Sequence, residues 1–230
     1  MKTIGMLGGM SWESTQGYYR AVNEGVKQTL GGLHSAKIVL NSVDFAEIEA
    51  CQRSADWPQA GKLLSQAAQS VEAAGADFLL ICTNTMHKVA DDIEAAINIP
   101  LLHVADATGA ALQQAGVTKV GLLGTAFTME QDFYKGRLRA KYDLDVMVPN
   151  DADRQMVHQV IFQELCLGVT SAASKAEYLR VIQSLKAQGA QAVILGCTEI
   201  GMLVSQADTE VPLFDTTAIH AQAAVTIALK

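Results

Sequence analysis

Eight short apolar runs alternate along the chain with longer stretches in which apolar residues recur at helical spacing. We expect the runs to be strands, and their ranges are Thr3–Leu7, Ala36–Asn41, Phe78–Ile81, Leu101–Val104, Val120–Leu123, Val146–Val148, Ala192–Leu195 and Val211–Phe214. Helices are predicted between them, for example over Gln59–Ala74 and Lys175–Gln188. Continuous apolar strands are typical of a parallel sheet covered on both faces. The alternation therefore predicts βαβ units in an α/β fold.

Three segments of the first half recur, in the same order, in the second half. The pairs are KTIGMLGGMSWESTQGYY from Lys2 with KVGLLGTAFTMEQDFY from Lys119, GADFLLICTNT from Gly75 with GAQAVILGCTE from Gly189, and IPLLH from Ile99 with VPLFD from Val211. Ordered echoes of this kind indicate a repeated architecture. We predict two pseudo-symmetric α/β domains with central parallel sheets, residues 1–105 plus 210–230 and residues 106–209, with an active site in the cleft between them.

The second pair of repeats aligns Thr83 with Cys197, and Cys82 with Gly196, at an offset of 114 residues without a gap. Both segments run from a strand into a loop, and open α/β sheets bind ligands beyond the carboxyl ends of their strands. Side chains alternate along a strand, so Cys82 should point away from Thr83 and into packing. If the halves face each other, Thr83 and Cys197 would flank one bound carbon, which is the arrangement that racemisation requires.

Cys197 is the stronger base of this pair, because a thiolate can remove a proton from carbon. A short apolar helical start follows it, and a helix N-terminus would lower the pKa of the thiol from its usual value of roughly 8.5. The hydroxyl groups of Thr83, Thr85 and Thr198, with backbone N–H groups, are donors that suit an α-carboxylate. The alternative for Cys197 is a buried structural thiol.

The first glycine-rich loop, in IGMLGGMSWEST, has the spacing GxxGG and not the GxGxxG of a dinucleotide site. We expect Gly8 and Gly9 to let the backbone approach a small ligand closely. Met10 and Ser11 follow the strand and are candidates to line the site, whereas Trp12 is expected to pack.

Two further candidates have ordinary structural interpretations. Thr125 and Thr128 occupy the corresponding loop of the second half, where lining the site and capping a helix are equally plausible. His87 is the one histidine near the TNT motif, and we expect it to be solvated or to cap a helix rather than to transfer protons.

Charge, hydropathy and cysteine spacing argue against several classes of protein. The net charge is −7 and no basic run occurs, which argues against a nucleic-acid partner. No stretch of 18 apolar residues suggests a membrane span, and the N-terminus reads as a strand and turn rather than a signal peptide. Four cysteines lie far apart, without metal-ligand spacing. We therefore expect a cytoplasmic protein with free thiols and no bound metal.

The motif IGMLGGM, the TNT motif at Thr83–Thr85 and the GCTE motif at Gly196–Glu199 together resemble the aspartate/glutamate racemase family. The match runs from Ile4 to about Phe214, nearly the whole chain. The resemblance implies two pseudo-symmetric α/β domains, no cofactor, an amino acid such as aspartate or glutamate as the small-molecule substrate, and a homodimer. It also implies that two cysteines perform racemisation from opposite faces of the substrate.

This chain departs from the family at one of those cysteines. Family members usually read CNT where this chain has Thr83, while the second cysteine matches Cys197. A hydroxyl is a far weaker acid than a thiol, so Thr83 is a poor general base at neutral pH. In similar racemases the second cysteine takes the proton of the L form, so the resemblance implies a preference for L substrates.

The resemblance also implies a set of substrate-binding residues. Those expected to hold the α-amino and carboxylate groups, or to lie beside the substrate, are Met10, Asn84, Thr85, Thr198 and Glu199. Gln52 is the candidate for the distal carboxylate, with Arg53 as its rival. Two other functions stay open: a single-cysteine decarboxylase of similar fold, and an amino-acid binding protein without catalysis. The preferred amino acid side chain also stays open.

Overall fold

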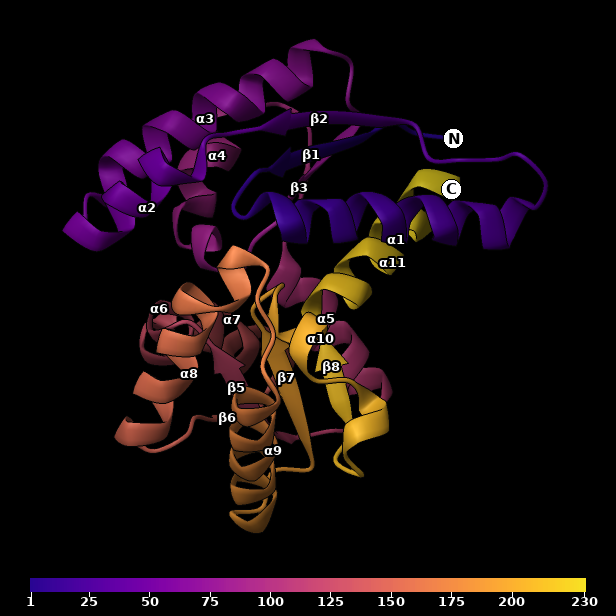
Figure 1. The fold of residues 1–230 in the computed structure, drawn as a ribbon. Helices are drawn as coiled ribbons and strands as arrows, with labels where there is room; N and C mark the ends of the chain where they lie inside the picture. The colour runs from indigo at the N-terminus through magenta and orange to yellow at the C-terminus, as the bar shows by residue number, and fades with distance from the viewer. The chain divides into compact units, whose positions relative to one another are not determined.

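Two four-stranded parallel sheets organise the chain, and their strands follow the same order. In the computed structural model, which describes residues 1–230, the orders are β2-β1-β3-β4 and β6-β5-β7-β8 (Figure 1). The strands are β1 (Ile4–Gly8), β2 (Ile38–Ser42), β3 (Phe78–Ile81), β4 (Leu101–Leu102), β5 (Lys119–Gly124), β6 (Asp145–Met147), β7 (Ala192–Gly196) and β8 (Leu213–Asp215). Every pairing is parallel, so the eight predicted strands and the parallel α/β class are confirmed.

The chain divides into two units, each with one sheet. The first comprises Met1–Val104 and His220–Lys230, and the second comprises Ala105–Ile219. Residues 210–219 therefore belong to the second unit and not, as predicted, to the first, because β8 pairs with β7. Helix α11 (Thr216–Leu229) then belongs to the first unit from His220 onward, and α5 (Val104–Gln114) belongs to the second from Ala105 onward.

The first sheet is covered on both faces. Helices α2 (Phe45–Ser54), α3 (Trp57–Ala73) and α4 (Ala90–Ala96) pack on one face, where Leu79 and Ile81 of β3 are buried. Helices α1 (Trp12–Leu30) and α11 cover the other, with Phe78 and Leu80. This alternation follows from the two-residue period of a strand. The edge strand β2 is the exception to full coverage, because Leu40 stays 42% exposed.

The second sheet is covered in a corresponding way. Besides α5, its helical segments are α6 (Ala126–Glu130), α7 (Asp132–Tyr142), α8 (Asp151–Gln163), α9 (Ala172–Ala187), α10 (Ile200–Leu203) and the 3-10 turns η2 (Leu165–Leu167) and η3 (Gln206–Asp208). Helices α8 and α9 pack against β5, and α9 also packs against β7. The three largest fully buried side chains of the chain are Tyr18, Tyr134 and Tyr178, and the last two lie in this unit.

Capping residues explain why two helices begin earlier than predicted. Asp56 caps α3 by accepting a hydrogen bond from the backbone N–H of Gln59, and Pro58 lies in the first turn, so the helix starts at Trp57. Ser171 caps α9 in the same way through the N–H of Ser174.

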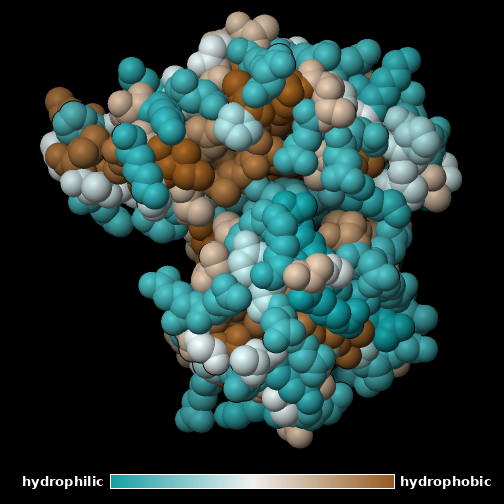
Figure 2. Space-filling model, turned by 180° about the vertical axis from the view of Figure 1, so that it is seen from behind, coloured by the Kyte–Doolittle hydropathy of each residue, from teal (hydrophilic) through white to brown (hydrophobic).

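Hydrophilic side chains cover much of the face shown in Figure 2, with apolar areas among them. None of the helices combines the length and the apolar character needed to cross a membrane.

Candidate active site

The pairing of the strands shows that the two repeated motifs occupy the same position in each sheet. In the first sheet Leu7 of β1 lies opposite Ile81 of β3. In the second sheet Leu123 of β5 lies opposite Leu195 of β7. These pairs are related by the offsets of 116 and 114 residues that superpose the repeated sequences. The repeat is therefore a repeat of structure, in register, and not only of sequence.

Thr83 lies two residues after Ile81 of β3, and Cys197 lies two residues after Leu195 of β7. Both side chains are 8% exposed, at the carboxyl end of an inner strand of their sheet. That end is where open α/β sheets bind ligands. The residues that follow Thr83 in the motif, Asn84 and Thr85, are buried too. Each unit thus brings a proton-carrying side chain to the same topological position.

Cys82 is a packing residue, as predicted. Its side chain is fully buried in the core under α1 and α11, with Phe78 and Leu80 of the same strand. Burial raises the pKa of its thiol far above the ordinary value. A thiol that does not ionise is neither a base nor a nucleophile.

His87 lies in the 3-10 turn η1 (Thr85–Val89) and is buried, so of the two roles expected for it the solvated one is wrong. The capping role agrees with its bond to Val104, the first residue of α5. Its Nδ1 lies 2.8 Å from the carbonyl oxygen of Thr83, and the backbone N–H of Val104 donates to its Nε2 at 3.2 Å. A carbonyl oxygen only accepts, so Nδ1 carries the proton. Burial, His103 and His220 all lower the pKa of His87 well below its usual value. The ring is neutral, and both of its nitrogens are occupied.

The glycine loop after β1 is shaped by the protein itself. A β-carbon on Gly9, whose φ is +92°, would collide with the backbone of Val43. One on Gly8 would collide with the side chain of Thr15, whose Oγ1 accepts a hydrogen bond from the N–H of Gly9 at 2.8 Å. A close approach of a ligand to the backbone stays a prediction, because the contacts within the protein already account for both glycines. They make room for Thr15 and for the loop after β2.

The three residues that follow Gly9 have different environments. Met10 is buried with Ile48 and Cys51 of α2 in the core. Trp12 is 64% exposed, so the expectation that it packs is wrong. Ser11 caps α1 by accepting from the N–H of Ser14 at 3.3 Å. The loop therefore ends at a capped N-terminus of α1.

Of the two candidates for the distal carboxylate, only Gln52 is buried. Its Nε2 donates to the sulfur of Met86 at 3.0 Å, directly after the TNT motif, and its Oε1 has no hydrogen-bond partner. Arg53 has a 74% exposed side chain, and it lies 3.5 Å from Glu49 on the same helix. A buried amide oxygen without a partner is costly unless a ligand or water satisfies it. The structure thus favours Gln52 over Arg53 as a binding residue.

In the second unit, Cys197 and Thr198 both bond to the carboxylate of Glu199. The thiol Sγ donates to Oε2 of Glu199 at 2.9 Å, and Thr198 Oγ1 donates to the same oxygen at 2.6 Å. All three side chains are buried. Sequence reasoning assigned Glu199 only to the substrate and did not anticipate its bond to the thiol.

The pKa of Cys197 moves in the opposite direction to the one predicted. Burial, and then the negative charge of Glu199, raise it well above the ordinary value. The helix that was expected to lower it is α10, which has only four residues and begins at Ile200. So short a helix builds up little dipole. Burial and the charge of Glu199 thus disfavour the thiolate of Cys197, whose thiol donates to that carboxylate.

Thr125 caps α6, and Thr128 supplies the backbone N–H that it caps. Thr125 Oγ1 accepts from the N–H of Thr128 at 3.3 Å and begins α6. The two hydroxyl groups lie 3.2 Å apart. Of the two interpretations left open by the sequence, helix capping is the one that the contacts support.

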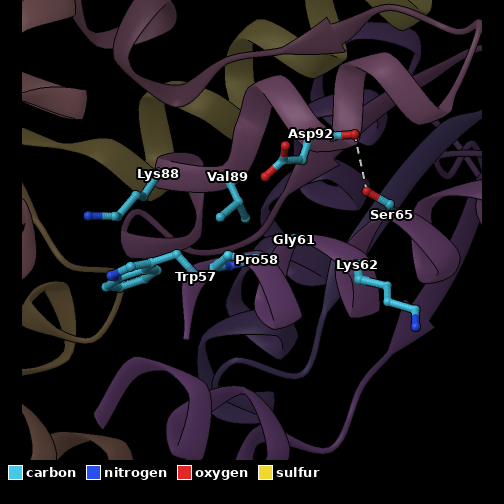
Figure 3. A pocket seen from close by; sticks show the side chains of 8 residues that line it. All are labelled: Trp57, Pro58, Gly61, Lys62, Ser65, Lys88, Val89 and Asp92. Atoms are coloured by element: carbon cyan, nitrogen blue, oxygen red, sulfur yellow. Dashed lines mark hydrogen bonds between the residues drawn. The ribbon is translucent and has the colours of Figure 1, made fainter. Parts of the chain in front are cut away.

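A groove of about 460 Å³ lies elsewhere in the first unit, between α3 and the segment that follows the TNT motif (Figure 3). In Figure 3 the side chain of Lys88 lies near the ring of Trp57, with its Nζ 4.3 Å from the ring centroid. Ser65 donates to the backbone oxygen of Asp92 at 3.1 Å. None of the predicted site residues lines this groove.

A family model described as Asp/Glu/hydantoin racemase matches residues 7–224, almost the whole chain. The chain belongs to the Asp/Glu/hydantoin racemase family. A crystal structure from Yersinia pestis, provisionally assigned as an Asp/Glu racemase, is 58% identical, with a TM-score of 0.93 and both chains fully covered. An aspartate racemase homologue from Pyrococcus horikoshii OT3 is 34% identical, with a TM-score of 0.87 and the same coverage.

The chain is also similar to a curated protein, the broad specificity amino-acid racemase RacX of Bacillus subtilis (strain 168). It is 22% identical, and the match covers 96% of each chain. Relatives with racemase names thus match the chain over its entire length. The two units and their repeated motifs are therefore those of a racemase-family protein.

Proposed function

We propose that this chain is a cofactor-independent amino acid racemase of the aspartate/glutamate type, in which Thr83 and Cys197 form the acid–base pair. The observation that carries the proposal is the strand register, which gives Thr83 and Cys197 equivalent positions in two sheets of the same order. Racemisation needs one group to remove the α-proton and another to deliver a proton to the opposite face. The racemase names of relatives that cover the whole chain support the same reaction class.

Cys197 removes the α-proton in this proposal. It must first become a thiolate, and Glu199 is placed to receive its proton at 2.9 Å. The bound amino acid brings an α-ammonium group, whose positive charge stabilises the thiolate that burial disfavours. The thiolate then takes the proton of the α-carbon and becomes a thiol again, leaving a carbanion on the substrate.

Thr83 supplies the new proton from the other face. Its hydroxyl donates a proton to the carbanion and takes one from a water molecule, since a threonine alkoxide is too basic to persist. The proton held by Glu199 neutralises the hydroxide left by that water, which restores the carboxylate beside the Cys197 thiol and closes the cycle. Donation to a strongly basic carbanion suits a hydroxyl, whereas removal of an α-proton by a hydroxyl does not.

This division of labour predicts a preference for L substrates. Cys197 corresponds to the cysteine that takes the proton of the L form in similar racemases. Starting from a D substrate, Thr83 would have to act as the base, and its hydroxyl is the weaker base of the pair. The proposed enzyme therefore turns over a saturating L substrate faster than a saturating D substrate, while kcat/KM is the same for both because enantiomers have equal free energy.

The remaining candidates hold the amino acid. Asn84, Thr85 and Thr198 offer hydrogen-bonding side chains, with backbone N–H groups, for the α-carboxylate and α-amino group. Met10 contributes an apolar wall, and the Glu199 carboxylate pairs with the α-ammonium as the substrate enters. Gln52 binds the distal carboxylate of the substrate, because its amide can turn so that Nε2 donates a hydrogen bond to that group. We further propose a homodimer in the cytoplasm.

A screen of L- and D-amino acids by proton NMR in heavy water tests the function. Loss of the α-proton signal of aspartate or glutamate, with appearance of the other enantiomer on chiral chromatography, is the expected result. Release of carbon dioxide from a malonate-type acid without α-proton exchange would instead indicate a decarboxylase. Binding of an amino acid without exchange would indicate a binding protein, and either result contradicts the proposal.

A further inference from the structure

His87 bonds to the backbone at both of its ring nitrogens, and one of these bonds reaches a residue of the proposed acid–base pair. Nδ1–H donates to the carbonyl oxygen of Thr83 at 2.8 Å, and Nε2 accepts from the N–H of Val104 at 3.2 Å. The ring thereby joins the loop after β3 to the start of α5. The side chain is 3% exposed, so water does not compete for these bonds.

The second half of the repeat has no counterpart to this side-chain bond. The position equivalent to His87, at the offset of 114 residues, is Gly201. A β-carbon there would lie 2.6 Å from Oδ2 of Asp215, so a side chain at this position would have to displace that carboxylate. The carbonyl of Cys197 instead accepts a backbone bond from Ile200 at 3.1 Å. A histidine tether exists only in the half that carries threonine.

The surroundings of His87 keep the ring neutral and in one tautomer. The ring centroids of His103 and His220 lie 4.5 and 6.0 Å from that of His87. His220 is itself bonded, to Tyr18 at 2.9 Å and to the carbonyl of Leu102 at 2.8 Å. Neutral His87 offers one donor and one acceptor, which is what its two backbone partners need.

We propose that His87 is a positioning residue for Thr83, fixing the peptide that joins Thr83 to Asn84 and so aiming the Thr83 hydroxyl at the α-carbon. The inference rests on the proposed function, since it assigns Thr83 the delivery of the proton. A hydroxyl is a weak acid, so its transfer depends strongly on placement, and a misplacement of about 1 Å can cost roughly a hundredfold in rate.

Deuterium labelling separates this role from a general loss of activity. L-Aspartate in heavy water can exchange its α-proton with retention, which needs only Cys197, or with inversion, which also needs Thr83. In His87→Leu the ratio of inversion to retained exchange should fall roughly tenfold or more. His87→Asn keeps a donor at the position of Nδ1 and should preserve most of the ratio. An unchanged ratio in His87→Leu, with both rates lowered together, overturns the proposal.

Two further variants sharpen this test. His220→Leu also removes a buried histidine of the first unit, but one that bonds to Tyr18 and Leu102, so it should lose stability and keep the ratio. In a Thr83→Ala background, adding His87→Leu should not change the ratio further, because the group that it positions is gone. A further tenfold fall in that background contradicts the proposal.

A spectroscopic measurement distinguishes failure of this inference from failure of the proposed function. If the wild-type protein exchanges no α-proton, the proposed function fails. The Asn84 amide belongs to the peptide whose carbonyl His87 holds, so its proton and nitrogen NMR shifts report the tether without any reaction. They should move in His87→Leu and stay near the wild-type values in His87→Asn. Shifts that stay unchanged in His87→Leu overturn the tether, whatever the activity.

Discussion

The thiol of Cys197 donates a hydrogen bond to Oε2 of Glu199 across 2.9 Å, and both side chains are buried. The carboxylate has two opposite effects on the thiol. Its negative charge disfavours the thiolate before the substrate binds, and its oxygen is also the nearest place for the thiol proton to go. The proposed base is therefore held in its inactive form until a positively charged amino group enters.

Glu199→Gln should make Cys197 more reactive and the enzyme slower. Removing the charge lowers the pKa of the thiol, so alkylation of Cys197 by iodoacetamide should speed up severalfold at pH 8. Turnover should fall, because the amide cannot take the thiol proton. Peptide mass spectrometry measures the alkylation of each cysteine. Cys166 is the least buried of the four cysteines and serves as the internal control. Slower alkylation of Cys197 in the variant would show that Glu199 activates the free thiol instead.

Cys197→Ser should nearly abolish racemisation, while Cys82→Ala should retain most of it. The first change replaces the proposed base by a hydroxyl. The second removes one buried sulfur from the core and should cost about 1 kcal/mol of unfolding free energy. Turnover of L-aspartate and urea unfolding measure the two effects. If Cys82→Ala were as inactive as Cys197→Ser while still folded, the alignment of the two motifs would be wrong.

Thr83→Cys should raise kcat in the D-to-L direction much more than kcat in the L-to-D direction, while kcat/KM stays equal in the two directions because enantiomers have equal free energy. A thiol in this position can become a thiolate base, which a hydroxyl cannot. Thr85→Cys places a thiol two residues further along and should give no gain in the D-to-L direction. Rates from each enantiomer, followed by polarimetry, give the comparison. Equal gains in both directions would not fit an asymmetric pair.

The unfolding free energy should fall as the pH drops from about 6.5 to 4. Burial lowers the pKa of His220 to about 4, and burial and its histidine neighbours lower the pKa of His87 well below its usual value. Below pH 6.5 these histidines bind protons in the unfolded chain but stay unprotonated in the native protein. The unfolding free energy therefore falls as the pH drops through this range. His220 accounts for about 3 kcal/mol of the loss, at about 1.4 kcal/mol per pH unit.

Urea unfolding at pH 7.0, 5.5 and 4.5 measures this dependence. His220→Gln cannot be protonated, so the variant should show a visibly shallower loss of stability than the wild-type protein. An identical pH dependence in the two proteins would mean that His220 is protonated within the fold.

The sequence predicts the strands and their repetition because both depend on local apolar patterns. The segments GADFLLICTNT and GAQAVILGCTE align without a gap, and β3 and β7 pair with β1 and β5 in matching registers. The alternation of side chains along a strand was enough to assign Cys82 to the core. The offset between the repeats was enough to place Thr83 opposite Cys197.

Contacts between distant segments, by contrast, leave no local pattern. The collision of a Gly9 β-carbon with Val43 depends on how the loop after β2 returns, so the sequence suggested a ligand there instead. The pKa of Cys197 depends on a carboxylate and on the length of α10, neither of which the motif GCTE reveals. The bond from His87 to Thr83 spans four residues, a helical spacing that could have suggested it.

Wash-in of deuterium from heavy water into L- and D-aspartate, followed separately by proton NMR, tests the asymmetric Thr83/Cys197 pair most directly. The account predicts that the α-proton of the L enantiomer exchanges much faster than that of the D enantiomer, because only Cys197 is a competent base. Equal initial rates of wash-in from the two enantiomers would contradict it.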